Sequence, residues 1–188
     1  MTPHDFMVEA ARLAKESVEN NWGGPFGAVI ARKDTVIARG QNRVLLTGDV
    51  TAHAEIEAIR KAVQVLNPNA PSVSVTRQNE STLELTSAKG PASAVASRRA
   101  RMLTGLEIYS TGQPCPMCMG AIYWAQLDGC YFGCDLEMTR KIGFDDSFLY
   151  EEFNRPVGTR QITMRQIFPE VGQEAYELWM QKEDRHYY

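Results

Sequence analysis

Thr-Gly-Gln-Pro-Cys-Pro-Met-Cys, residues 111–118, is the stretch from which the fold and the chemistry of this chain follow. Cys115 and Cys118 lie three residues apart, and Pro116 between them is favoured at the first position of a helix. Both sulfurs then face the same side of a first helical turn. Backbone N–H groups and the helix dipole favour the thiolate there, which is the form that binds a metal.

A histidine motif occurs earlier in the chain, where residues 51–55 read Thr-Ala-His-Ala-Glu. Apolar residues recur at helical spacing after it, so we predict a second helix from His53 to Leu66. One His and two Cys bind zinc with one coordination position open, which is how catalytic zinc is held. We therefore expect one zinc ion per chain on His53, Cys115 and Cys118.

Glu55 turns the expected metal site into a hydrolytic one. A carboxylate beside a zinc-activated water can take its proton and pass it to a leaving group, because zinc lowers the pKa of that water to about 7. His-x-Glu followed by Pro-Cys-x-x-Cys is the signature of zinc nucleobase deaminases, in which the Glu is a proton shuttle and not a ligand. Both motifs occur here in that order.

Two simpler interpretations compete with catalysis. A Cys-x-x-Cys pair alone is often a structural zinc half-site or a redox pair. A closed structural site needs a fourth ligand, and the candidates Cys130 and Cys134 lie in an apolar, strand-like run. Buried thiols of that kind are usually small core residues. The two motifs, each opening a helix, therefore favour a catalytic site.

The whole chain has the composition of one globular domain spanning residues 1–188, with 44% hydrophobic and 23% charged residues. Its 20 Lys and Arg against 23 Asp and Glu argue against a nucleic-acid partner and favour a small-molecule substrate. No stretch approaches the ~18 apolar residues of a membrane span, and the N-terminus lacks an export signal. We expect a cytoplasmic protein without disulfides and without a membrane partner.

The order of the predicted elements indicates an α/β fold. Strand, helix and strand around the cysteine motif imply parallel neighbours joined by a right-handed crossover. A site at helix N-termini that follow strands is where such sheets bind ligands. The predicted elements are a helix from Pro3 to Asn20, strands at Phe26–Ala31 and Thr35–Asn42, the helix from His53, a strand at Leu106–Ser110, a helix through Ala125, and a strand at Cys130–Cys134.

Two segments stand outside this order. Residues 67–104 form an insertion whose alternating apolar residues near Val75 and Leu83 predict a hairpin, and whose Ala-rich part at 91–102 predicts a helix. Its Arg98–Arg101 cluster is typical of a solvated face, so we assign it no chemistry. In the C-terminal segment 171–188, apolar residues at helical spacing by themselves predict a helix packed on the domain.

With these residues collected, the chain resembles the bacterial guanine deaminases of the cytidine deaminase-like superfamily. The zinc motifs are common to the superfamily, whereas the Gly-Pro-Phe-Gly and Gly-Phe-Asp-Asp pieces point to guanine. The stretches that carry the resemblance are Gly23–Ile30, Gly40–Asn42, Thr51–Glu55, Pro114–Cys118, Gly120–Ala125 and Gly143–Phe148.

The resemblance implies a three-layer α/β/α sandwich with a mixed five-stranded sheet and the hydrolytic deamination of guanine to xanthine and ammonia. It implies zinc on His53, Cys115 and Cys118, with Glu55 as the proton shuttle. It further implies a domain-swapped homodimer in which segment 171–188 is exchanged between subunits. The residues that it implies for substrate binding are Phe26, Asn42, Ala54, Asp146 and Tyr188, with His53 also flanking the ring.

Two departures from the family keep alternatives open. The family usually has Cys-Glu before Pro-Cys-Pro-Met-Cys, whereas this chain has Gly112 and Gln113, and the insertion at 67–104 has no counterpart in shorter members. Guanosine, ammeline, cytosine and the wobble adenosine of tRNA are the competing substrates. Pro116 and the acidic charge balance argue against the tRNA. A zinc-stabilised subunit without turnover is the alternative from another class, and the presence of Glu55 argues against it.

Overall fold

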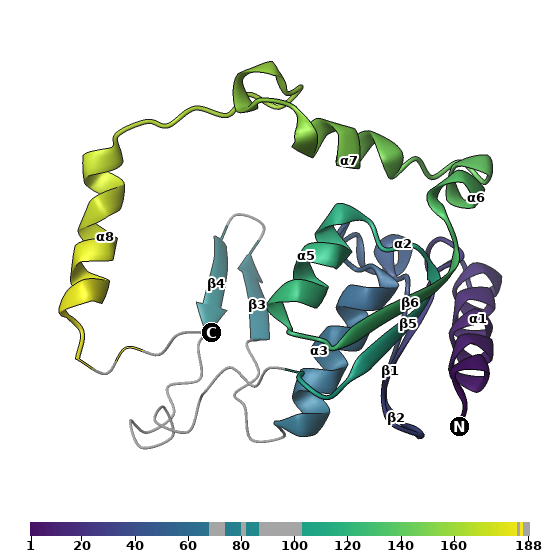
Figure 1. Ribbon diagram of the computed structural model, residues 1–188. Helices are drawn as coiled ribbons and strands as arrows, with labels where there is room; N and C mark the ends of the chain where they lie inside the picture. Colours follow the sequence, from purple (N-terminus) through teal and green to yellow (C-terminus); the bar gives the residue numbers. More distant parts are fainter. Residues whose placement is uncertain (68–73, 80–81, 87–102, 184, 186–188) are drawn as a thin grey trace.

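The structure is a computed structural model that describes residues 1–67, 74–79, 82–86, 103–183 and 185. At its centre lies a mixed sheet in the order β2-β1-β5-β6 (Figure 1). β1 pairs antiparallel with β2 and β5, whereas β5 and β6 run parallel, as the crossover around the cysteine motif predicts. The strands are β1 (Gly27–Arg32), β2 (Thr35–Gln41), β5 (Glu107–Gly112) and β6 (Gly129–Cys134).

Helices cover both faces of this sheet, so the predicted three-layer α/β/α architecture is confirmed. Helix α1 (Pro3–Glu19) lies on one face, while α3 (Ala54–Leu66) and α5 (Pro116–Trp124) lie on the other (Figure 1). Each face has its own apolar core, one around Phe6 and Val29 and the other around Ile30, Ala58 and Ile108. The two helices that carry the zinc motifs therefore pack against the same side of the sheet.

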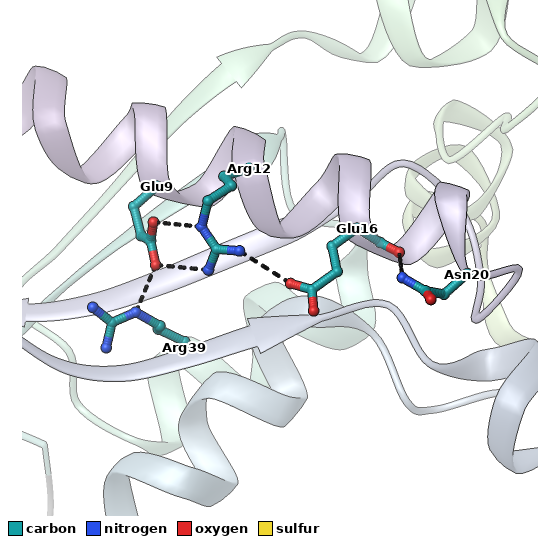
Figure 2. Close-up of polar contacts among 5 residues, drawn as sticks. All are labelled: Glu9, Arg12, Glu16, Asn20 and Arg39. Carbon is teal, nitrogen blue, oxygen red and sulfur yellow. Dashed lines mark hydrogen bonds and ion pairs between the residues drawn. The ribbon is translucent and has the colours of Figure 1, made fainter.

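An ionic network ties α1 to the edge strand β2 (Figure 2). Glu9 accepts hydrogen bonds from Arg12 on its own helix and from the Nε of Arg39 on β2, the latter at 2.6 Å. Arg12 also bonds Glu16 one turn along, at 3.1 Å. The hydrogen bonds from Arg12, followed by that from Arg39, lower the pKa of Glu9 to about 2.

The prediction of five strands is wrong for the described residues, in which the main sheet has four. Among the described residues, β6 is an edge strand of this sheet and pairs only with β5. After β6 come α6 (Leu136–Lys141), α7 (Ser147–Asn154) and a short 3-10 turn (Val157–Thr159). After this turn, residues 160–168 run away from the sheet towards α8 and form no strand (Figure 1).

Helix α8 (Pro169–Gln181) stands apart from the sheet and its helices (Figure 1). Every residue of α8 is exposed, including the apolar side chains of Val171, Tyr176, Leu178 and Met180. The sequence periodicity correctly predicted a helix here. The interpretation that it packs on its own domain is wrong, because its apolar side chains are left in solvent.

The predicted hairpin in the insertion is confirmed as a separate antiparallel pair, β3 (Ser74–Asn79) and β4 (Thr82–Thr86). The insertion leaves the fold at the C-terminal end of α3 and returns just before β5. The predicted helix at 91–102 lies outside the described residues. Among the residues that are described, no helix combines the length and apolar character needed to cross a membrane.

Candidate active site

Three metal-ligating side chains meet where two helices begin. His53 is the N-cap residue of α3 and Cys115 that of α5, so both helix N-termini point at the same spot. The Nδ1 atom of His53 lies 3.7 Å from the Sγ of Cys115 and 3.6 Å from that of Cys118. Tetrahedral zinc with ordinary Zn–S and Zn–N bonds would hold these atoms about 3.6 Å apart. The donor set and its spacing therefore fit zinc.

The electrostatics of the two thiols also suit a cation. A hydrogen bond from Cys118, assisted by His53, lowers the pKa of Cys115 to about 4. The pKa of His53 is raised in turn, chiefly by its hydrogen bond to Cys115. Cys115 is therefore the thiolate at the metal position. Cys118 is the thiol that donates the hydrogen bond to Cys115, and this bond raises the pKa of Cys118 far above its usual range.

Glu55 lies beside the ligands, on the first turn of α3. Its side chain is buried, with only 6% exposed, and burial raises the pKa of its carboxyl above the ordinary value. Ser110 donates a hydrogen bond to Oε1 at 3.1 Å, and the Cys118 thiol approaches Oε2 at 3.4 Å. The structure thus places a protonatable carboxyl in contact with the metal site, as the motif predicts.

A cavity of about 230 Å³ opens above these groups. Its lining includes His53, Glu55 and Cys115 together with aromatic, aliphatic and polar side chains. The other lining residues are Gly23, Gly24, Phe26, Asn42, Val44, Leu45, Val50, Gln113, Phe144 and Asp146. An apolar pocket with a few convergent polar groups is the usual form of a small-molecule site.

Three of the five residues predicted to bind substrate line this cavity. The ring of Phe26 meets that of Phe144 edge to face at 5.1 Å, which fixes its orientation. The buried Asn42 accepts a hydrogen bond from the Val44 backbone N–H on its Oδ1, so its amide nitrogen is the donor that it can offer a ligand. Asp146 stands half-buried at the start of α7.

The other two predicted residues are placed differently. Ala54 is fully buried at the first position of α3, between His53 and Glu55, and is not part of the cavity lining. The group that Ala54 could offer a ligand is its backbone N–H, because the N–H groups of a first helical turn have no partner within the helix. Tyr188 lies outside the described residues.

Asp146 is held near the zinc ligands by its own helix. Tyr150, one turn further along α7, donates a hydrogen bond of 2.7 Å to the carbonyl oxygen of Pro114, which precedes Cys115. Desolvation, followed by the negative charge of Cys115, raises the pKa of Asp146. A carboxyl in this position can accept hydrogen bonds from a ligand or hold a proton there.

The apolar rim of the cavity is a feature that the sequence analysis missed. Leu45 of helix α2 (Val44–Thr47) lines the cavity, and the backbone N–H groups of Leu45 and Leu46 donate hydrogen bonds to the carbonyl oxygen of Trp22. Ser110 was missed as well, although a hydroxyl at a buried position of the strand before the cysteine motif was a usable signal. Apolar residues in a short loop gave no such signal.

Cys130 and Cys134 do not join the metal cluster, which among the described residues consists of His53, Cys115 and Cys118. Burial raises the pKa of the half-buried Cys130 to about 11, as suits a small core residue. The same interpretation of Cys134 is wrong, since it is exposed at the end of the edge strand.

Comparison with known proteins agrees with this geometry. Guanine deaminase of Bacillus subtilis (strain 168) is 34% identical over 179 residues, which cover 95% of this chain and 94% of the relative. The X-ray structure of guanine deaminase from Bacillus subtilis matches with a TM-score of 0.80, covering 100% of this chain and 99% of that one at 33% identity. The tRNA-specific adenosine deaminase of Agrobacterium fabrum is 29% identical over 71% of this chain and 66% of its own length.

The family itself follows from the part of the chain that carries the zinc motifs. Residues 1–134 match the family described as the cytidine and deoxycytidylate deaminase zinc-binding region. This match spans α1, the sheet and both ligand-bearing helices. The chain therefore belongs to the cytidine and deoxycytidylate deaminase family of zinc-binding proteins.

Proposed function

We propose that this protein is a zinc-dependent deaminase that hydrolyses guanine to xanthine and ammonia. The observation that carries the proposal is the buried carboxyl of Glu55 beside three metal ligands, in a pocket also lined by Phe26 and Asn42. The likeness to Bacillus subtilis guanine deaminase over 95% of the chain supports guanine as the base.

The residues around Glu55 have distinct roles in the proposed reaction. His53, Cys115 and Cys118 would hold zinc, which supplies Lewis-acid activation of water at neutral pH. Glu55 takes a proton from the attacking water as its oxygen bonds the ring carbon, and then delivers that proton to the exocyclic nitrogen. The carbon–nitrogen bond breaks, its electron pair leaves with the nitrogen, and ammonia departs. Burial raises the pKa of Glu55, which suits a group that must both accept and return a proton.

The walls of the pocket suit a flat base. Phe26 offers an aromatic face, the Asn42 amide nitrogen a donor, and Asp146 an acceptor for ring or amino N–H groups. The cavity of about 230 Å³ is smaller than the ~300–1,000 Å³ of pockets that hold drug-sized ligands. The size favours a free base over a nucleoside, which must also accommodate a ribose.

A substrate panel tests the proposal. Zinc-loaded protein is assayed for ammonia release from guanine, guanosine, ammeline, cytosine and a tRNA with adenosine at the wobble position. We expect guanine to give the highest kcat/KM. Faster turnover of cytosine or tRNA would contradict the pocket assignment. One zinc per chain without ammonia from any substrate would instead favour a catalytically silent zinc-binding subunit.

We also propose that the protein is a homodimer that exchanges its C-terminal segment. Two observations support this: β6 presents an open edge, and residues 160–168 leave the domain as an extended segment with Ile162, Met164 and Ile167 exposed. An edge strand presents unpaired N–H and C=O groups that a second chain can use. In the proposed dimer segment 171–188 is exchanged between the subunits, and Tyr188 closes the partner's pocket.

A cytoplasmic location is the third part of the proposal. All four cysteines are free thiols in the structure, and two of them belong to the metal site. A reducing compartment keeps such thiols available for zinc. Fractionation of cells that express the protein, followed by immunodetection, would locate it.

A further inference from the structure

Ser110 contacts the carboxyl of Glu55. The serine belongs to β5, the strand that leads into the cysteine motif, and its side chain is fully buried. Its hydroxyl donates a 3.1 Å hydrogen bond to the Oε1 atom of Glu55, which is 55 residues away in the chain. Ser110 is not part of the cavity lining. Its hydrogen-bond contact with the site is the one to Glu55.

The position of this hydroxyl is unusual for packing alone. β5 lies between β1 and β6, and Ser110 is opposite Ala28 on one side and Phe132 on the other. Two residues before it on the strand, Ile108 belongs to the apolar core. Burying a hydroxyl in such a place costs free energy unless the group is hydrogen-bonded, and Glu55 is its bonding partner. An apolar residue would pack there without this requirement.

The second oxygen of Glu55 meets a different group. Oε2 lies 3.4 Å from the Cys118 sulfur, which donates a hydrogen bond when it is a thiol. A thiolate that binds a metal has no proton to donate. In that state Ser110 remains as the side chain that orients the carboxyl among the described residues, and Oε2 is the oxygen left to exchange a proton.

We propose that Ser110 is a positioning residue: its hydroxyl fixes Oε1 of Glu55 so that Oε2 faces the reacting water and the leaving amine. The inference rests on the proposed role of Glu55 as proton shuttle. A proton shuttle works only within hydrogen-bond reach of its donor and acceptor, and small misplacement of a catalytic group can lower the rate about 100-fold. Ser110 thus contributes to turnover without touching substrate or metal.

The first test is kinetic and uses Ser110→Ala in the zinc-loaded protein. We expect kcat for guanine to fall about 10- to 100-fold, while KM changes less than about twofold and zinc content stays at one per chain. Ser110→Thr, which keeps the hydroxyl, should restore most of kcat. Thr139→Val is the matched control, because it removes a buried hydroxyl that bonds only the backbone of its own helix. We expect this control to keep the original kcat.

The second test does not depend on turnover. Crystal structures of the zinc-loaded protein should show the Ser110 hydroxyl on Oε1 of Glu55, and those of Ser110→Ala should show the carboxyl in more than one orientation. In the Glu55→Gln background, Ser110→Ala should change the guanine dissociation constant less than about twofold.

These measurements separate failure of the inference from failure of the proposed function. A Ser110→Ala protein with unchanged kcat, with KM altered together with kcat, or with a single Glu55 orientation would overturn the role of Ser110. A parent protein that deaminates no base, with the Ser110–Glu55 contact present in its crystals, would overturn the role of Glu55 and with it this inference. If Ser110→Thr does not fold, the kcat of Ser110→Ala and the crystals decide.

Discussion

The part of the chain with the zinc motifs, residues 1–134, and the C-terminal arm, residues 162–183, differ in how far their apolar side chains are buried. In residues 1–134 large apolar side chains pack on both faces of the sheet, and buried polar groups such as Ser110 and Asn42 have hydrogen-bond partners. In the arm every residue is exposed, including Ile162, Ile167 and Phe168. The first region has its own apolar cores, whereas the second leaves its apolar side chains exposed, as protein–protein contact surfaces do.

The junction between the two regions is itself ordered by specific contacts. The buried Glu152 accepts a hydrogen bond from the Gln161 backbone N–H at 2.8 Å and pairs with Arg155 at 2.7 Å. Arg160 donates to the carbonyl oxygens of Phe153 and Arg155. These contacts close a turn just before the arm. The direction in which the arm leaves is thus set by the chain, which favours a defined partner over a loose tail.

The largest expected effect is the loss of activity on substitution of Glu55, which lies in residues 1–134. Glu55→Gln should lower kcat for guanine about 10²–10⁴-fold, because it removes the proton shuttle. The amide has nearly the same shape, so zinc content and oligomeric state should not change. Steady-state ammonia release, metal analysis and light scattering check these three outcomes. Full activity in this variant would contradict the assigned chemistry.

Removal of the arm tests whether residues 1–161 fold and bind zinc without it. A chain that ends at Gln161 should fold and bind one zinc, but it should be monomeric. Circular dichroism, metal analysis and sedimentation give the three readouts. A truncated chain that folds and still dimerises would show that the arm is not the interface.

A mixing experiment tests whether the end of the arm acts on the partner subunit. Deleting Arg185–Tyr188 should leave fold and zinc unchanged and lower kcat or raise KM, because the pocket loses its cover. Heterodimers with a Glu55→Gln chain contain one intact Glu55 covered by a full tail, so part of the activity should return. If heterodimers form and stay as inactive as their parents, the tail does not act across the interface.

The junction should have a smaller effect. Glu152→Ala removes a buried acceptor and an ion-pair partner, so the turn before the arm should loosen and the dimer dissociation constant should rise about tenfold, since a hydrogen bond to a charged group contributes ~1.5–3 kcal/mol. Glu151→Gln is the matched control, because that neighbouring carboxylate is exposed. Equal dimer dissociation constants for the two variants would show that the turn around Glu152 does not contribute to dimer formation.

The smallest effect concerns how the free energy of unfolding falls at acid pH. The folded pKa of Glu9 is about 2, below its ordinary value of 4.5, so its contribution is present above pH 4.5 and is lost as pH falls toward 2. Because Arg12 and Arg39 are half exposed, we expect only about 1 kcal/mol. Glu9→Gln should therefore lose less stability between pH 5 and pH 2, as measured by urea unfolding. Parallel curves for the two proteins would contradict this.

Sequence reasoning was most successful where one residue type has one local consequence. Thr2 and Pro3 start α1, and Pro116 starts α5 just after Cys115, so the ligand positions followed from capping rules. The parallel pairing of β5 and β6 followed from the order of elements. Ser110 and the rim residue Leu45 were not predicted, because their roles depend on which elements meet in space.

The course of residues 160–168 and the position of α8 could not be predicted from the sequence for a different reason. Residues 162–165 alternate apolar and polar side chains, a pattern that predicts a strand equally well in this chain or in a partner. The helical period of α8 likewise predicts an apolar face but not what covers it. Only the turn around Glu152 shows that the segment leaves its own domain.

The place of the hairpin insertion has a consequence for how this protein can be altered. The insertion begins where α3 ends, and α3 carries His53 at its other end. With 13 residues this helix is about 20 Å long, so the insertion leaves the fold at the end of α3 that is far from His53. A peptide tag or a reporter domain grafted between these two strands should leave deamination intact, which makes the insertion a practical attachment point for biosensor construction.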